Sequence, residues 1–122
     1  MRILGIHHAS LRVRDLSRSR IFFENILGLP VRPDRPNKDF GGLWYDAGPQ
    51  QIHLIVAEDL ENVAAGDYPG VDRHIALRVE NLPGLIRRLE DNGIPYLPSR
   101  SGRPVVFCRD PDGNGFELIG EP

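Results

Sequence analysis

Cysteine is nearly absent from the sequence, which has only Cys108 among its 122 residues. One cysteine cannot form an intramolecular disulfide, which argues against a disulfide-stabilised secreted domain and fits a reducing compartment. Long hydrophobic runs are also missing, since a run such as residues 54–57 is far shorter than the roughly 20 residues of a membrane span. The first residues show no signal-peptide pattern. We therefore expect a cytoplasmic protein with no membrane partner.

The chain also lacks an excess of either charge. Lys and Arg total 15 against 17 for Asp and Glu, a net charge of -2, and the basic residues are spread along the sequence. Because nucleic-acid binding usually needs a basic patch, we expect no nucleic-acid partner. There is no phosphate-binding glycine loop, nucleophile elbow or paired-cysteine zinc motif. What remains is a globular chain, 40% hydrophobic, with the length of one domain.

The sequence repeats itself. Residues 8–16 (HASLRVRDL) align with residues 74–82 (HIALRVENL), and five of the nine positions are identical. Two further matches follow in the same order, residues 28–30 with 93–95 and residues 46–55 with 110–119. Three matches in one order indicate a duplicated unit of about 60 residues.

The residue pattern in each copy predicts a strand, a helix and three more strands. The first copy has strands at 6–13, 30–35, 43–46 and 51–56, and a helix that follows the capping residue Asp15 and ends at Leu27. The second copy has strands at 71–79, 95–98, 105–109 and 115–119, and a helix between the capping residue Asn81 and Gly93. We expect an α+β fold in a single domain of residues 1–122. Its two tandem βαβββ modules cover about 4–57 and 71–120, joined by a connector at about 58–70.

Polar residues fall on one face of the predicted strands. Strand alternation places His8, Ser10 and Arg12 opposite an apolar face, and His74, Ala76 and Arg78 repeat the pattern. His53 and Glu117 occupy equivalent positions in the last strand of each copy. If the copies pack about a pseudo-two-fold axis, the side chains of His8, His53, His74 and Glu117 converge. Imidazole and carboxylate suit Zn, Ni, Co, Mn or Fe(II), and four protein ligands would leave two positions open on a six-coordinate ion.

Other residues allow simpler interpretations. His7 has no counterpart in the repeat and is interpreted as a hydrogen-bonded structural residue. Arg12 and Arg78 are either ordinary rim residues or the cations that attract an anionic substrate. The Asp110-Pro-Asp-Gly segment predicts a tight turn that sets the register of the strand bearing Glu117. Trp44, Tyr45 and Phe107 are predicted to lie in the core or a pocket wall, and Cys108 to be a packed thiol.

These motifs resemble the vicinal-oxygen-chelate superfamily of glyoxalases, bleomycin-resistance proteins and extradiol dioxygenases. The resemblance covers residues 6–119 and includes His8-x-x-Leu-Arg-Val-x-Asp-Leu, Gln51-Ile-His53-Leu and Asp110-Pro-Asp-Gly-x-x-x-Glu117-Leu. It implies paired βαβββ modules whose mixed sheets curl around a metal cup. It also implies a homodimer, with cups built from modules of two chains, and the metal positions His8, His53, His74 and Glu117.

The resemblance favours a glyoxalase I-like lyase or isomerase, in which a divalent ion holds two neighbouring oxygens of a small substrate and Glu117 moves a proton. His53 stands where glyoxalase I usually has a glutamate, and an asparagine that helps hold glutathione has no match. With one anionic ligand the ion keeps a charge of about +1, which favours an anionic substrate. The alternatives are an Fe(II) extradiol-type dioxygenase, a fosfomycin-resistance-type transferase and a non-catalytic, bleomycin-type binding protein.

Overall fold

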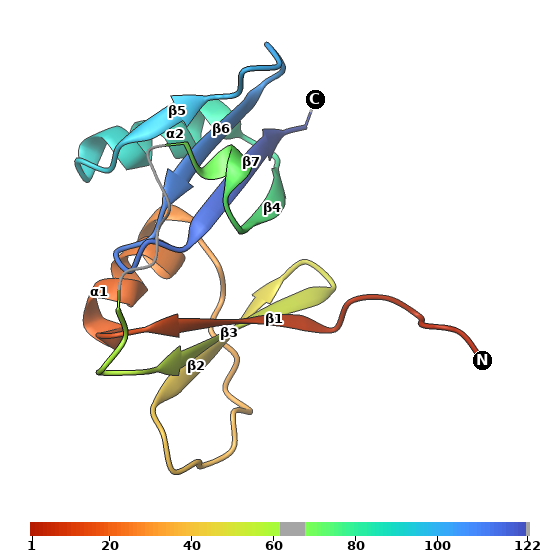
Figure 1. Ribbon diagram of the computed structural model, residues 1–122, viewed down its shortest axis with the longest axis vertical. Helices are drawn as coiled ribbons and strands as arrows, with labels where there is room; N and C mark the ends of the chain where they lie inside the picture. The colour runs from red at the N-terminus through yellow and green to blue at the C-terminus, as the bar shows by residue number, and fades with distance from the viewer. Residues whose placement is uncertain (62–67, 122) are drawn as a thin grey trace. The chain divides into compact units, whose positions relative to one another are not determined.

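The computed structural model describes residues 1–61 and 68–121 and divides into two compact units, Met1–Leu60 and Glu61–Pro122 (Figure 1). The first unit contains β1 (His8–Val13), α1 (Leu16–Arg20), a π-helix η1 (Ile21–Ile26), β2 (Gly42–Ala47) and β3 (Gln50–Val56). The second contains a 3-10 helix η2 (Pro69–Val71), β4 (His74–Val79), α2 (Leu82–Asp91), β5 (Tyr96–Pro98), β6 (Val105–Arg109) and β7 (Gly115–Gly120).

Both units build their sheets in the same way. In the first the strand order is β1-β3-β2, with β1 parallel and β2 antiparallel to β3. In the second the order is β4-β7-β6-β5, with β4 parallel and β6 antiparallel to β7. The registers also repeat, because Ser10 pairs with His53 and Ala76 pairs with Glu117. The predicted α+β fold with duplicated mixed sheets is confirmed.

Capping residues start both main helices where the sequence predicts. The Asp15 carboxylate accepts a hydrogen bond from Ser17 N at 2.9 Å, and the Asn81 side chain accepts one from Gly84 N at 3.0 Å. The first helix is not α-helical to Leu27, however. From Ile21 it continues as a π-helix, in which Leu27 N bonds Phe22 O at 2.9 Å.

The predicted strand at 30–35 is wrong, since it is reduced to one bridge between Val31 and Tyr45. Pro30 and Pro33 have no backbone N–H to give to a ladder, which limits the pairing. Arg32 N still bonds Trp44 O at 2.7 Å, so the segment follows the edge of β2 for a short distance. The first strand of each unit also starts later than predicted, at His8 and His74.

Each unit buries the apolar face of its own sheet. The largest buried side chains of the first unit are Val13, Phe22, Phe23, Ile26, Tyr45 and Leu54. Those of the second are Leu89, Cys108, Phe116 and Leu118. Burying the apolar faces leaves the opposite faces, which carry the histidines, for chemistry. None of the helices described is long and apolar enough to cross a membrane.

Candidate functional site

The first unit brings His8 and His53 into contact. They lie on neighbouring strands, β1 and β3, two positions apart in register, because His53 pairs with Ser10. Their rings stack with centroids 4.0 Å apart and planes 15° apart. The His8 Nδ1 atom lies 2.8 Å from His7 Nδ1, so His7 is a hydrogen-bonding neighbour of a predicted ligand.

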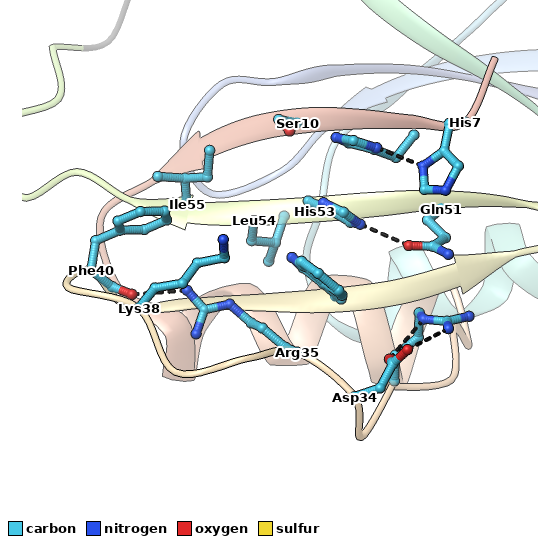
Figure 2. Close-up of a pocket in the computed structure, with 13 residues that line it drawn as sticks. His7, Ser10, Asp34, Arg35, Lys38, Phe40, Gln51, His53, Leu54 and Ile55 are labelled. Carbon is cyan, nitrogen blue, oxygen red and sulfur yellow. Dashed lines mark hydrogen bonds and ion pairs between the residues drawn. The ribbon is translucent and has the colours of Figure 1, made fainter.

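His53 is held on both sides. Trp44, its cross-strand partner on β2, stacks on the other ring face at 4.3 Å and 9°. Its Nε2 donates to Gln51 Oε1 at 2.8 Å (Figure 2). The side chain is buried, and this burial, reinforced by the positive charges of His8, His7, Arg32 and Lys38, lowers its pKa to about 4. His53 is therefore a neutral imidazole at physiological pH, the form that binds metals.

A cavity of about 500 Å³ opens over these rings and is lined entirely by residues of the first unit. Small-molecule sites commonly have volumes of roughly 300–1,000 Å³. Its lining combines histidines, the aromatic residues Phe40 and Trp44, and charged side chains from the segment between η1 and β2 (Figure 2). The cavity can take a small polar molecule beside His8 and His53.

The second unit brings together His74 of β4 and Glu117 of β7. His74 Nε2 lies 3.1 Å from Glu117 Oε1, and the two side chains are 24% and 16% exposed. His74 Nδ1 donates to the Asp72 carbonyl at 2.7 Å. Because Nδ1 carries that proton, a neutral His74 has its lone pair on Nε2, beside the carboxylate. A backbone carbonyl behind one ring nitrogen is the usual support for a histidine that binds metal through the other.

The turn ahead of β7 positions Glu117, as the sequence predicts. Asp110 Oδ1 accepts from Asp112 N at 3.0 Å and from Asn114 N at 2.8 Å, and Asp110 N bonds Asn114 O at 3.0 Å. Burial raises the pKa of the Asp110 carboxyl to about 6. Cys108 in β6 is a packed thiol, as predicted, because it is 2% exposed and burial raises its pKa to about 12.

The four predicted ligands thus form two pairs, one in each unit. Within residues 1–61 and 68–121, no three His, Cys, Asp or Glu side chains lie close enough together to hold an ion. The donor types of each pair nevertheless fit a divalent metal: His8 with His53, and His74 Nε2 with a Glu117 oxygen.

Arg12 and Arg78 lie on the same strand faces as the histidines but are exposed. Arg12 is 3.8 Å from Asp59, and Arg78 is 3.7 Å from Glu121. Arg12 is not among the described residues that line the cavity. A role for either arginine in substrate binding stays a prediction.

The sequence analysis gave two of the cavity residues no role. Gln51 shares a strand face with His53, as period-two alternation predicts, and holds the His53 ring by a hydrogen bond. Lys38 lies in an irregular segment where no periodicity applies, and its only sequence signal is that it is the single lysine of the chain.

A match to a family model identifies the superfamily to which these duplicated sheets belong. The chain belongs to the Glyoxalase/Bleomycin resistance protein/Dioxygenase superfamily, whose model matches residues 5–118. It is similar to the lactoylglutathione lyase of Salmonella typhimurium, with 31% identity over 98% of this chain and 92% of the relative. It is also similar to the metallothiol transferase FosB of Bacillus licheniformis, with 28% identity over 96% of this chain and 75% of the relative. These relatives are enzymes, and this chain is an enzyme of the same superfamily.

Solved structures agree on the fold. A glyoxalase family protein from Bacillus anthracis matches with a TM-score of 0.79 and 25% identity, and the match covers 100% of both chains. The fosfomycin resistance protein FosX of Listeria monocytogenes matches with a TM-score of 0.76 over 99% of this chain and 94% of that one. At 18% identity, the second match shows the fold alone.

Proposed function

We propose that the protein is a divalent-metal-dependent enzyme of the glyoxalase I type, a lyase or isomerase whose small substrate binds the ion through two neighbouring oxygens. The proposed ligands are His8, His53, His74 and Glu117. The contact between His74 and Glu117 carries the proposal, because the hydrogen bond to Asp72 O leaves His74 Nε2 directed at a carboxylate oxygen. Both pairs occupy positions that the duplication makes equivalent, which supports a shared role.

When bound, a divalent ion supplies Lewis acidity for the negative charge that develops on the substrate oxygens. The chain's own residues supply orientation and proton transfer. Glu117 is the proposed catalytic residue, since a carboxylate within hydrogen-bond reach of the substrate can take a proton from carbon. Its Oε1 lies 3.1 Å from His74 Nε2. Trp44 and Gln51 hold the neutral His53 ring in place.

The lactoylglutathione lyase relatives suggest the substrate, an adduct of a thiol with a 2-oxoaldehyde. The test is to mix methylglyoxal with glutathione or L-cysteine and follow formation of the lactoyl thioester. We expect activity that EDTA abolishes and that Zn, Ni, Co or Mn restores. Glu117→Gln should lower kcat by about 100-fold or more, because the proton acceptor is lost. Full activity in EDTA, or in Glu117→Gln, would contradict the proposal.

A second candidate is transfer of a thiol to the epoxide of fosfomycin. Two observations favour it. The chain is similar to FosB, named a metallothiol transferase. The cavity is lined by Arg32, Arg35 and Lys38 against a single carboxylate, which suits the negative charge of a phosphonate. Mass spectrometry of fosfomycin incubated with protein, metal and L-cysteine distinguishes the two. Formation of the thiol adduct of fosfomycin, by a preparation that makes no lactoyl thioester from methylglyoxal, would favour the transferase.

A further inference from the structure

One wall of the first unit's cavity is cationic. The lining contains Arg32, Arg35 and Lys38, all from the segment between η1 and β2, and a single carboxylate, Asp34 (Figure 2). The two arginines are already engaged. Arg32 bonds Asp34 at 2.7 Å and Asp46 at 2.6 Å, whereas Arg35 Nη2 donates to Phe40 O at 2.8 Å. Among the described residues, two carboxylates therefore neutralise Arg32, whereas Arg35 contacts only a neutral carbonyl and the Phe40 ring, and its buried Nε has no hydrogen-bond partner.

Lys38 is different. Its ammonium lies over two aromatic rings, 5.7 Å from the centroid of Phe40 and 5.9 Å from that of Trp44. Such cation–π contacts hold a cation without neutralising its charge. No carboxylate in the described part of the chain forms an ion pair with it. Lys38 is thus a cation of the cavity that is held in position yet available to an anion.

The same aromatic ring links Lys38 to the predicted metal site. Trp44 lies under the ammonium and also stacks on His53 at 4.3 Å. A molecule in the cavity beside His53 therefore meets an apolar ring surface and a positive charge together. These features are complementary to an organic anion with a flat apolar part, since the ring buries the apolar part and the ammonium pairs with the charge.

The second unit has a related cluster of aromatic rings and a cation. Phe107 pairs with Glu117 as Trp44 pairs with His53. Phe107 packs on Tyr68 with centroids 5.1 Å apart, and the Arg100 guanidinium lies 3.9 Å above the Tyr68 ring. The cation of the second unit therefore lies on Tyr68, one ring removed from the strand partner of Glu117, whereas Lys38 lies over the strand partner of His53 itself.

We propose that Lys38 binds the anionic group of the substrate, a small organic carboxylate, phosphate or phosphonate whose apolar part lies against Trp44 and Phe40. The inference rests on the proposed function, because it names the substrate class of the same site. It assigns substrate charge recognition in the first unit to Lys38, whereas Arg12 is paired with Asp59 outside the cavity lining.

The single lysine permits a direct test. Acetic anhydride would be added to the protein as purified, and acetylation of Lys38 and of the Met1 α-amine followed by peptide mass spectrometry. Phenylphosphonate at several times its Kd should slow acetylation of Lys38 by about fivefold, since an occupied site protects the amine. Benzyl alcohol, which has the ring without the charge, should not protect, and Met1 should react at one rate throughout. An unchanged Lys38 rate with phenylphosphonate would overturn the proposal.

Calorimetry with three probes then measures the contributions to binding. Phenylphosphonate and benzoate distinguish the two anionic groups, and inorganic phosphate lacks the ring. Lys38→Gln should weaken phenylphosphonate binding about tenfold, whereas Lys38→Arg should retain most of the affinity. Arg87→Gln, an exposed charge change on α2, is the matched control. Equal affinity in Lys38→Gln and wild type, or phosphate binding as tightly as phenylphosphonate, would contradict the inference.

The metal content of the same samples separates this inference from the proposed function. Lys38→Gln should keep its metal and lose affinity for the anion, because Lys38 is not a proposed ligand. If no preparation bound metal but Lys38→Gln still weakened anion binding, the metal proposal would fail and the role of Lys38 would stand.

Discussion

At the scale of single residues, a hydrogen bond supports each of the proposed ligand rings of His53 and His74. Gln51 accepts the Nε2 proton of His53 and so leaves Nδ1 with the lone pair. Removing such a support typically weakens a metal site by about 10–100-fold. The assignment of His53 as a ligand can therefore be tested without altering His53.

We expect Gln51→Leu to lower metal affinity by about tenfold, because the His53 ring loses its hydrogen bond. Competition with a chromogenic chelator measures the affinity. Gln50→Leu is the matched control, since Gln50 is exposed and lies one position earlier on β3. If Gln51→Leu binds metal as tightly as Gln50→Leu, His53 lines the cavity without binding the ion.

At the scale of elements, two polar contacts fix parts that carry the site. The first joins η1 to β2. The Tyr45 hydroxyl is fully buried and donates to Glu24 Oε2 at 2.8 Å. Burial and the Glu24 carboxylate raise the pKa of Tyr45, so the hydroxyl keeps its proton. Because β2 also carries Trp44, this contact helps to position the wall of the cavity.

Tyr45→Phe should lower the free energy of unfolding by about 1–2 kcal/mol, because it removes a largely buried hydrogen bond to a charged group. Urea denaturation measures the loss. Tyr96→Phe, at a half-buried position of β5, provides the control and should change stability by less than about 0.5 kcal/mol. Equal stability of the two variants would show that the Glu24 contact contributes nothing.

The second contact is the Asp110 turn ahead of β7. The folded protein binds the Asp110 proton with a pKa of about 6, mainly because of burial and also because of the Asp112 charge. The unfolded chain has the ordinary value of about 3.9. Between these values the folded state binds more protons, so the free energy of unfolding contributed by Asp110 falls as pH rises from about 4 to 6.

Asp110→Asn should remove this pH dependence while keeping an oxygen for Asp112 N and Asn114 N. Urea unfolding at several pH values between about 4 and 7 gives the difference between variant and wild type. We expect the variant to gain stability relative to wild type as the pH rises. A difference that does not vary with pH would mean that Asp110 titrates normally.

At the scale of the whole molecule, the duplication made most of the fold predictable. Strand alternation separated His8 and His74 from the apolar faces, and repeat equivalence selected His53 and Glu117. The exceptions have local causes. Pro30 and Pro33 suppress a strand that hydrophobic pattern favours, and Lys38 reaches Trp44 through an irregular segment whose path depends on tertiary contacts. How many ligands share one ion is a question of long-range assembly, which sequence spacing does not determine.

The superfamily's members are often dimers, and the resemblance implies sites built from two chains. We therefore expect a homodimer by light scattering. Chains carrying His8→Ala and His74→Ala, each inactive alone, should regain about a quarter of wild-type activity when refolded together, since half the random dimers have one intact site of two. No recovery would show that each site uses ligands of a single chain.

The metal content of protein purified without chelators tests the central claim most directly. We predict one divalent ion per site in wild type and in Gln50→Leu, because Gln50 is exposed and is not a proposed ligand. His8→Ala, His53→Ala, His74→Ala and Glu117→Gln should each lose most of it, although they alter different units. Elemental analysis that found no ion in wild type, or full occupancy in variants of one pair, would contradict a site shared by all four residues.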